Sequence, residues 1–266
     1  MRFVLGGSDT EMKHIERVLL EQGHEVIKAE IEGIRVTRGQ AYRADYPVPR
    51  IRDVWVECQH ADYTKREMYS LGIDIVDHHY EGDPGYGKPP AEYWEASSIG
   101  QVYNLLGLES DYEARMIAAG DHCLYAAYHS MCPGIDKEDF KSYRMSYFGS
   151  NSRPKKFASE FGSATMLAKS CETIKLGDLT VVDLTPMTEK HYSWLSDISC
   201  LLNMKFATIR PHHKKEGMTK YFVGNLARKE IDYFMNELVP TLGDEVISVY
   251  GDPTRQFAGA IVWESK

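Results

Sequence analysis

Residues 72–79 read Gly-Ile-Asp-Ile-Val-Asp-His-His, an apolar stretch that ends abruptly in a carboxylate and two imidazoles. Open parallel sheets place their ligand sites at the carboxyl ends of their strands, where loops converge. Carboxylate and imidazole together suit divalent transition metals. We therefore expect Asp77, His78 and His79 at the edge of such a sheet. The alternative is a turn capped by Asp77 and followed by two surface histidines.

The segments around this stretch alternate between strand-like and helix-like patterns. Ile15, Val18 and Leu19 recur at a helical period, and Gly23 ends that helix. We expect strands at Arg2–Leu5, Glu25–Lys28, residues 51–56 and residues 73–76, and helices at residues 11–23, 63–71, 97–106 and 111–128. Strands separated by helices of this length favour a parallel sheet with helices on both faces.

The pattern changes in the middle of the chain. Turn signals at Pro133-Gly134 and Gly149-Ser150, followed by Arg153-Pro154, favour a linker at residues 133–160. We therefore predict an α/β protein with a metal-binding domain at residues 1–132 and a smaller C-terminal α+β domain at residues 161–266. In the latter we expect strands at residues 179–184, 206–210, 220–223, 245–250 and 259–263, and a helix at residues 228–238.

The composition of the chain limits which classes of partner it can bind and where it can be located. The net charge of −8 argues against binding long nucleic acid, and no apolar run approaches the ~20 residues that cross a membrane. The five cysteines are scattered, which favours reduced thiols. Arg2–Leu5 reads as a strand rather than as part of an export signal, so we expect a cytoplasmic protein. Whether it forms a homodimer is left open.

Two further segments extend the pattern. Residues 96–106 begin Ala-Ser-Ser-Ile-Gly and continue as an amphipathic helix, and residues 118–122 read Ala-Ala-Gly-Asp-His. An apolar strand into Asp-His-His, a Ser-Ser helix and a later lone Asp follow each other in this order. In these features residues 2–128 resemble the DHH phosphoesterase superfamily. That group includes RecJ-type exonucleases, oligoribonucleases, cyclic-dinucleotide phosphodiesterases and family II inorganic pyrophosphatases.

The resemblance implies a centre of divalent ions, with Mn²⁺ expected first and Mg²⁺, Co²⁺, Fe²⁺ or Zn²⁺ as alternatives. By position, the implied metal ligands are Asp9, Glu11, Glu57, His78 and Asp121. His79, next to Asp77, would face the substrate phosphate, and these two are the candidate catalytic residues. A metal-bound water would supply the nucleophile, and the ions would neutralise charge on the phosphoryl oxygens.

Three positions depart from the family's pattern. Gly6-Gly7-Ser8 stands where the family has a His before its Asp-x-Asp, and Glu replaces Asp at Glu11 and Glu57. A pair of ions held ~3.5–4 Å apart tolerates the longer side chain poorly. We therefore expect one tightly held ion and a second that is weak or absent.

Other roles are open for some of these residues. Asp9 could cap the helix that follows it. Glu57 and His60 could lie in a solvated loop, or His60 and Asp62 could replace missing ligands.

The second half carries a weaker resemblance. Residues 250–260 read Tyr-Gly-Asp-Pro-Thr-Arg-Gln-Phe-Ala-Gly-Ala, where the family often has a Gly-Gly-Gly-His…Ala-Ala-Gly loop. Thr254 takes the place of the His. The adjacent arginine could bind a phosphate through two parallel hydrogen bonds, or it could simply be solvated. Residues 210–215 form a second basic cluster with the same two interpretations. The candidate substrate-binding residues are Arg255, Arg210, His212 and His213.

These observations predict a divalent-metal-dependent phosphohydrolase. Its substrate would be a small phosphorylated molecule: a short oligonucleotide, a nucleotide or a related phosphodiester. The alternative is a catalytically degenerate DHH-like module that binds nucleotides or regulates, which the departures favour. An inorganic pyrophosphatase is a weaker third reading, because the N-terminal His and a lysine-rich C-terminal signature are missing.

Overall fold

The computed structural model describes residues 1–151, 154–189, 191–212 and 217–263. The chain divides into two compact units. Unit 1 consists of residues 1–123 and 131–135, and unit 2 of residues 124–130 and 136–266.

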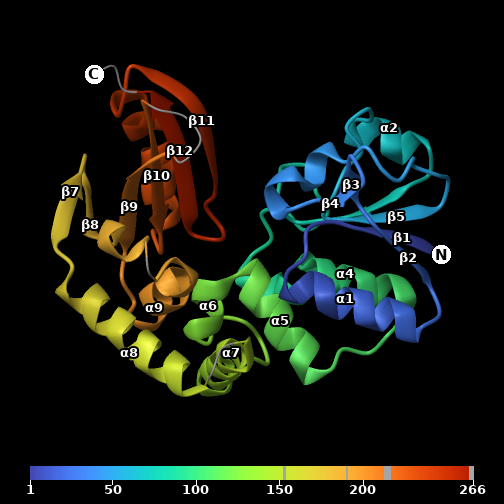
Figure 1. Ribbon diagram of the computed structural model, residues 1–266, viewed down its shortest axis with the longest axis horizontal. Helices are drawn as coiled ribbons and strands as arrows, with labels where there is room; N and C mark the ends of the chain where they lie inside the picture. Colours follow the sequence, from blue (N-terminus) through green and yellow to red (C-terminus); the bar gives the residue numbers. More distant parts are fainter. Residues whose placement is uncertain (152–153, 190, 213–216, 264–266) are drawn as a thin grey trace. The chain divides into compact units, whose positions relative to one another are not determined.

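Unit 1 is built on a parallel sheet with the strand order β2-β1-β5-β6. Its strands are β1 (Arg2–Leu5), β2 (Glu25–Lys28), β5 (Asp53–Val56) and β6 (Asp74–Val76), beside a small hairpin of β3 (Glu30–Ile31) and β4 (Ile34–Arg35). Its helices are α1 (Thr10–Glu21), α2 (Lys65–Ser70), α3 (Tyr93–Ala96), α4 (Ser98–Leu106) and α5 (Tyr112–His122), with the 3-10 helices η1 (Arg38–Arg43) and η2 (Pro90–Glu92). Figure 1 shows α1 and α4 on one face of this sheet and α2 on the other. The predicted parallel sheet with flanking helices is confirmed.

The two central strands explain why the sheet is so well defined. Every residue of β1 and of β5 is buried, as expected for parallel strands covered on both faces. The register pairs Leu5 with Val56, and Val56 with Val76. The three strands therefore end level with one another, and the loops that follow them begin at the same edge.

Unit 2 contains a second sheet with the strand order β11-β12-β10-β9-β8-β7, in which only the β8–β9 pair is parallel among the described residues. Its strands are β7 (Thr173–Leu176), β8 (Leu179–Asp183), β9 (Phe206–Pro211), β10 (Met218–Gly224), β11 (Glu245–Asp252) and β12 (Phe257–Trp263). Its helices are α6 (Leu124–Tyr128), α7 (Lys137–Asn151), α8 (Pro154–Ser170), α9 (Leu195–Leu201) and α10 (Arg228–Tyr233), the π-helical turn η5 (Phe234–Leu238) and the 3-10 helices η3 (Thr185–Met187), η4 (Tyr192–Trp194) and η6 (Val239–Thr241).

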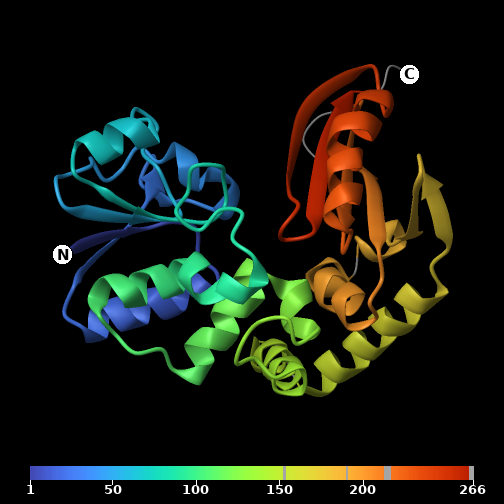
Figure 2. The same ribbon diagram turned by 180° about the vertical axis from the view of Figure 1, so that it is seen from behind.

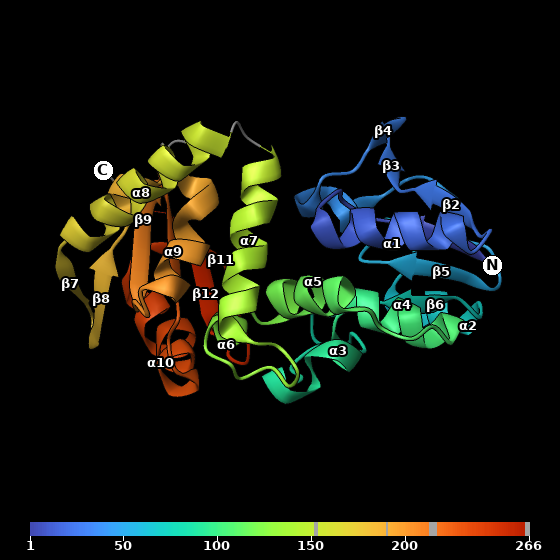
Figure 3. The same cartoon turned by 90° about the horizontal axis from the view of Figure 1, so that it is seen from below.

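The two faces of the second sheet are covered by different helices. Ile231 and Phe234 pack with Val223 against one face, where Figure 2 shows α10 and η5. On the other face, Phe206 packs with Ile198 and with residues of α8, and Figure 3 shows α8 and α9 beside β9. The predicted C-terminal domain built around a sheet is therefore present.

The segment predicted as a linker, residues 133–160, is mostly helical in its described part. The side chain of Asp136 accepts hydrogen bonds from the backbone N–H groups of Glu138 and Asp139, which caps the start of α7. Phe140 is fully buried and anchors that helix. Pro154 occupies the first position of α8, where proline favours a helix start rather than a linker. No helix in the described part of the chain is long and apolar enough to cross a bilayer.

Candidate metal centre

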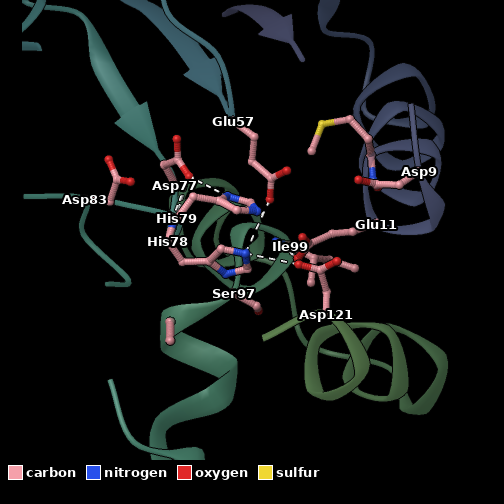
Figure 4. A network of polar contacts seen from close by, with 12 residues as sticks. Asp9, Glu11, Glu57, Asp77, His78, His79, Asp83, Ser97, Ile99 and Asp121 are labelled. Atoms are coloured by element: carbon pink, nitrogen blue, oxygen red, sulfur yellow. Dashed lines mark hydrogen bonds and ion pairs between the residues drawn. The ribbon is translucent and has the colours of Figure 1, made fainter. Parts of the chain in front are cut away.

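The candidate site lies at the carboxyl edge of the unit 1 sheet. The backbone N–H of Gly6 donates to Val56, and that of Glu57 donates to Val76, at 3.0 and 2.9 Å. These bonds continue the parallel ladder by one residue and bring the loops after β1, β5 and β6 together. Figure 4 shows the side chains from these loops converging with Asp121 of α5.

Four side chains form a compact cluster. Glu57, His78, His79 and Asp121 each offer one ligand atom, and these atoms lie within 4.8 Å of one another. The Nε2 atom of His78 is 3.0 Å from a carboxylate oxygen of Asp121 and 3.7 Å from one of Glu57. His78 is fully buried, whereas the Asp121 side chain is 23% exposed. The cluster is therefore open to solvent on the Asp121 side.

The chemistry of this cluster fits a divalent cation. The buried Oε1 atom of Glu57 makes no hydrogen bond within the described residues. Burial and the charges of Asp121 and Asp9 raise the pKa of Glu57 to about 7, although His79 acts in the opposite direction. A cation would offset this cost of holding buried carboxylates together. Two imidazoles and two carboxylates are donors that suit Mn²⁺, Fe²⁺, Co²⁺ or Zn²⁺.

Asp77 positions one of these imidazoles. Its Oδ1 atom accepts hydrogen bonds from the Nδ1–H of His79 at 2.9 Å and from the backbone N–H of His78 at 2.7 Å. Its Oδ2 atom accepts one from the hydroxyl of Tyr42 at 2.8 Å. Burial opposes ionisation, but the hydrogen bond and charge of His79 and the Tyr42 hydroxyl lower the pKa of Asp77. A carboxylate that binds one ring nitrogen in this way fixes the orientation of the ring, as is usual for a metal-ligating histidine.

Asp9 and Glu11 lie next to the cluster but outside the four-residue set. Asp9 accepts a hydrogen bond from the backbone N–H of Met12 at 2.7 Å, and its other oxygen is 3.1 Å from Nε of Arg38. It is thus the N-cap of α1. Burial and the charge of Asp121 raise its pKa.

Glu11, in the first turn of α1, is almost fully buried against the start of α4. Its Oε1 atom accepts a hydrogen bond from the backbone N–H of Ile99 at 2.8 Å, while Oε2 has no hydrogen bond within the described residues. Burial first, and then the charges of Asp121 and Glu57, raise the pKa of Glu11 well above its usual value. Both predicted N-terminal ligands therefore already have structural partners.

The backbone around Gly6 and Gly7, in the loop after β1, leaves no room for side chains. A Cβ atom at Gly6 would lie 2.3 Å from the carbonyl oxygen of Glu57, and one at Gly7 would lie 2.6 Å from the backbone nitrogen of Arg38. No side chain fits at either position. Glu57 itself has a φ of +49°, a conformation that is uncommon for residues other than glycine and that recurs at functional sites.

His60, considered as a replacement ligand, holds its own loop instead. One ring nitrogen lies 3.1 Å from the carbonyl oxygen of Asp45, and the other accepts the backbone N–H of Asp62 at 3.2 Å. Neither Tyr42 nor Arg38 stands out in the sequence, because the segment that forms η1 has no clear strand or helix period. Both became apparent only from their contacts with Asp77 and Asp9.

The predicted substrate-binding residues belong to unit 2, and their relation to the metal centre stays a prediction. Arg255 lies in the loop between β11 and β12, with its guanidinium 5.6 Å from the centre of the Phe257 ring. The Asp252 side chain closes that loop by accepting the backbone N–H of Thr254 at 2.8 Å. Arg210, on β9, lies over the ring of Tyr192. His212 follows β9 directly, and His213 lies outside the described residues.

Comparisons with known proteins give little support for any family. No protein-family model matches the chain, and no curated protein matches it. One solved structure that aligns with it is described as "pGpG-specific phosphodiesterase - PggH from Vibrio cholrae", at 11% sequence identity and a TM-score of 0.42. The alignment covers 98% of this chain and 92% of that one. So distant a similarity carries no argument about the function of this chain.

Proposed function

We propose that this protein is a divalent-metal-dependent phosphohydrolase. Its substrate is a small phosphorylated molecule: a short oligonucleotide, a nucleotide or a related phosphodiester. The observation that supports this most strongly is the convergence of Glu57, His78, His79 and Asp121 within 4.8 Å. A divalent ion in this cluster, for which we propose Mn²⁺, supplies a nucleophile at neutral pH and neutralises phosphoryl charge.

The residues around the ion then have separate tasks. Asp77 holds the His79 ring by its Nδ1–H, so that the ring keeps one orientation toward the ion. Asp121 lies on the exposed side of the cluster, where a substrate enters. The exposed guanidinium of Arg38, beside Asp9, is placed to contact a phosphate oxygen.

A single tightly bound ion agrees best with these contacts. Asp9 is engaged by Arg38 and by the start of α1, and Glu11 is engaged by the start of α4. Neither side chain belongs to the four-residue cluster. A second ion would therefore have to displace existing interactions.

A specific observation favours a second candidate function, that of a nucleotide-binding or regulatory module without efficient catalysis. Gly6 and Gly7 exclude a side chain from the loop where the resembling family places a His. If that group is needed for turnover, the centre would bind an ion and a phosphorylated ligand but would hydrolyse it slowly.

The test measures metal content and hydrolysis together. Purified protein is loaded with Mn²⁺, dialysed, analysed for metal and assayed on bis(p-nitrophenyl) phosphate and on 5′-phosphorylated dinucleotides. We expect about one ion per chain and measurable turnover. Asp121→Asn should lower both. Asp111→Asn is the matched control, because Asp111 caps the same helix through the backbone N–H of Ala114 and asparagine caps equally well.

The outcomes separate the two candidates. Metal without turnover on any of these substrates would favour the binding module. A wild-type chain that retains no more Mn²⁺ than Asp121→Asn would overturn the metal centre itself.

A further inference from the structure

Unit 2 contains two cations placed side by side on one face of its sheet. Arg210 of β9 and Lys220 of β10 are direct partners in the antiparallel register, and Thr208 and Phe222 form the next pair on the same face. All four line a small cavity, together with Tyr192 and Ser196. This cavity belongs to unit 2 alone and contains no residue of the proposed metal centre.

Nothing in the described part of the chain neutralises this pair. Like charges directly opposite each other on neighbouring strands destabilise a sheet. Within the described residues no carboxylate forms an ion pair with Arg210 or Lys220, and none lines the cavity. Burial lowers the pKa of Lys220, and the neighbouring Arg210 lowers it further. The arrangement costs stability unless an anion lies between the two cations.

Aromatic rings hold both cations in place. The guanidinium carbon of Arg210 is 4.8 Å from the centre of the Tyr192 ring, and Nζ of Lys220 is 5.7 Å from that of Tyr250. A Cβ atom at Gly259 would lie 2.3 Å from the Tyr250 ring, so glycine is what lets this ring lie across β12 toward Lys220. Such contacts fix the cations before any ligand arrives.

We propose that this cavity binds a phosphate group between Arg210 and Lys220. Arginine offers a planar fork for two phosphate oxygens, and lysine adds a second positive charge. The hydroxyls of Thr208 and Ser196 line the same cavity and provide neutral donors. Two cations match the charge of a phosphate better than that of a carboxylate. Tyr192 as a whole residue is 57% exposed, which leaves room for an attached nucleoside to stack on its ring.

The experiment titrates inorganic phosphate into the full-length His78→Ala variant by calorimetry, with metal-free wild type as a second background in case that variant folds poorly. Both backgrounds remove the metal centre as a competing phosphate site. Arg210→Gln and Lys220→Met, added to either background, should each weaken phosphate binding about 10-fold or more. Lys229→Met, an exposed lysine of the same unit, should leave it unchanged.

Phosphate binding that is equally strong in Arg210→Gln and Lys220→Met would overturn the proposal, as would an equal response to chloride at the same ionic strength. A 5′-phosphorylated dinucleotide identifies the source of the phosphate. If it binds more tightly than inorganic phosphate and Tyr192→Ala removes the difference, the ligand is a nucleotide. Equal affinities indicate a free phosphate, and both results require the cavity. Because the titration contains no metal, its result is independent of the proposed hydrolase activity.

Discussion

The proposed metal centre of unit 1 and the proposed phosphate cavity of unit 2 present the same electrostatic problem with opposite signs. In unit 1, carboxylates gather around the buried imidazole of His78 and the partly exposed imidazole of His79 at the end of a parallel strand. Glu57 and Glu11 are buried, each with an oxygen that lacks a hydrogen bond within the described residues. In unit 2, an arginine and a lysine face each other across two antiparallel strands. Each arrangement is unfavourable alone, so each indicates a ligand of the opposite charge.

A third cluster shows what charges look like when the fold itself pairs them. The guanidinium of Arg144 forms two hydrogen bonds of 2.8 Å with the carboxylate of Asp197, one to each oxygen. The hydroxyl of Tyr128 donates a third to the same carboxylate at 2.8 Å. Here both signs are present and satisfied, and no ligand is needed. The comparison therefore predicts opposite effects of charge removal in paired and unpaired clusters.

The largest effect is expected in the paired cluster. Asp197→Ala leaves Arg144 without its buried counter-ion, and breaking such a pair costs about 3–5 kcal/mol of unfolding free energy. Urea unfolding of wild type and variant measures this difference. The control is Asp232→Ala, an exposed carboxylate in the same unit. A loss below about 1 kcal/mol would mean that the pair is not the stabilising element that its geometry indicates.

The next largest effect is expected on Mn²⁺ affinity, through the orientation of the His79 ring. Asp77→Asn keeps an acceptor for the backbone N–H groups but weakens the bond that fixes the His79 ring, so Mn²⁺ affinity should fall about 10- to 100-fold. Competition with a coloured chelator measures the affinity. Asp74→Asn is the control and should have no effect, because Asp74 is an exposed carboxylate at the start of β6, the strand that leads to Asp77. Unchanged affinity in Asp77→Asn would show that His79 is not held as a ligand.

The sequence predicted much of unit 1, for reasons that are local. The apolar run of residues 73–76 ends at Asp77, and parallel strands bring such ends to one edge, so the positions of His78 and Glu57 followed. The cap that Asp9 forms at the start of α1 is also local, and it is one of the two roles that the sequence offers for this residue. The contact of Glu11 with the start of α4 did not follow, because it depends on packing between segments far apart in the sequence.

Unit 2 was less predictable from the sequence because its features depend on register. Residues 210–215 stand out as a basic cluster, but nothing in the sequence connects Lys220 with them. The pairing of Arg210 with Lys220 requires the register of β9 with β10, which no local pattern specifies. The helix α7 is hard to predict for a different reason, since the turn signals of residues 133–160 outweigh the local helix cap at Asp136.

A smaller effect on the free energy of unfolding is expected at Glu11, and it tests whether this residue is a metal ligand or only lies beside the ligands. Glu11→Gln keeps the acceptor for Ile99 and removes a buried negative charge, so the metal-free protein should gain about 1 kcal/mol, the scale of repulsion between neighbouring charges. The raised pKa of Glu11 means that its contribution to stability is full at low pH and is lost as pH rises. The gain should therefore grow with pH.

The same variant tests whether Glu11 is a ligand. Bound Mn²⁺ should stay near the wild-type level in Glu11→Gln, whereas Glu57→Gln, the matched change inside the cluster, should lower it. Equal loss of metal in both variants would place Glu11 among the ligands and would favour a two-ion centre.

The smallest effect is expected at the phosphate cavity, and it has the opposite sign to that of Asp197→Ala. Lys220→Met keeps most of the aliphatic stem and removes the charge that faces Arg210, so without phosphate the variant should be more stable by about 0.5 kcal/mol. With saturating phosphate the order should reverse, because wild type gains binding energy that the variant has lost. Urea unfolding in both conditions measures this reversal, with Lys229→Met as the control.

If Lys220→Met is less stable than wild type in both conditions, the lysine stabilises the sheet through its contact with Tyr250. The cavity would then be the counterpart of the paired Arg144–Asp197 cluster rather than of the metal centre.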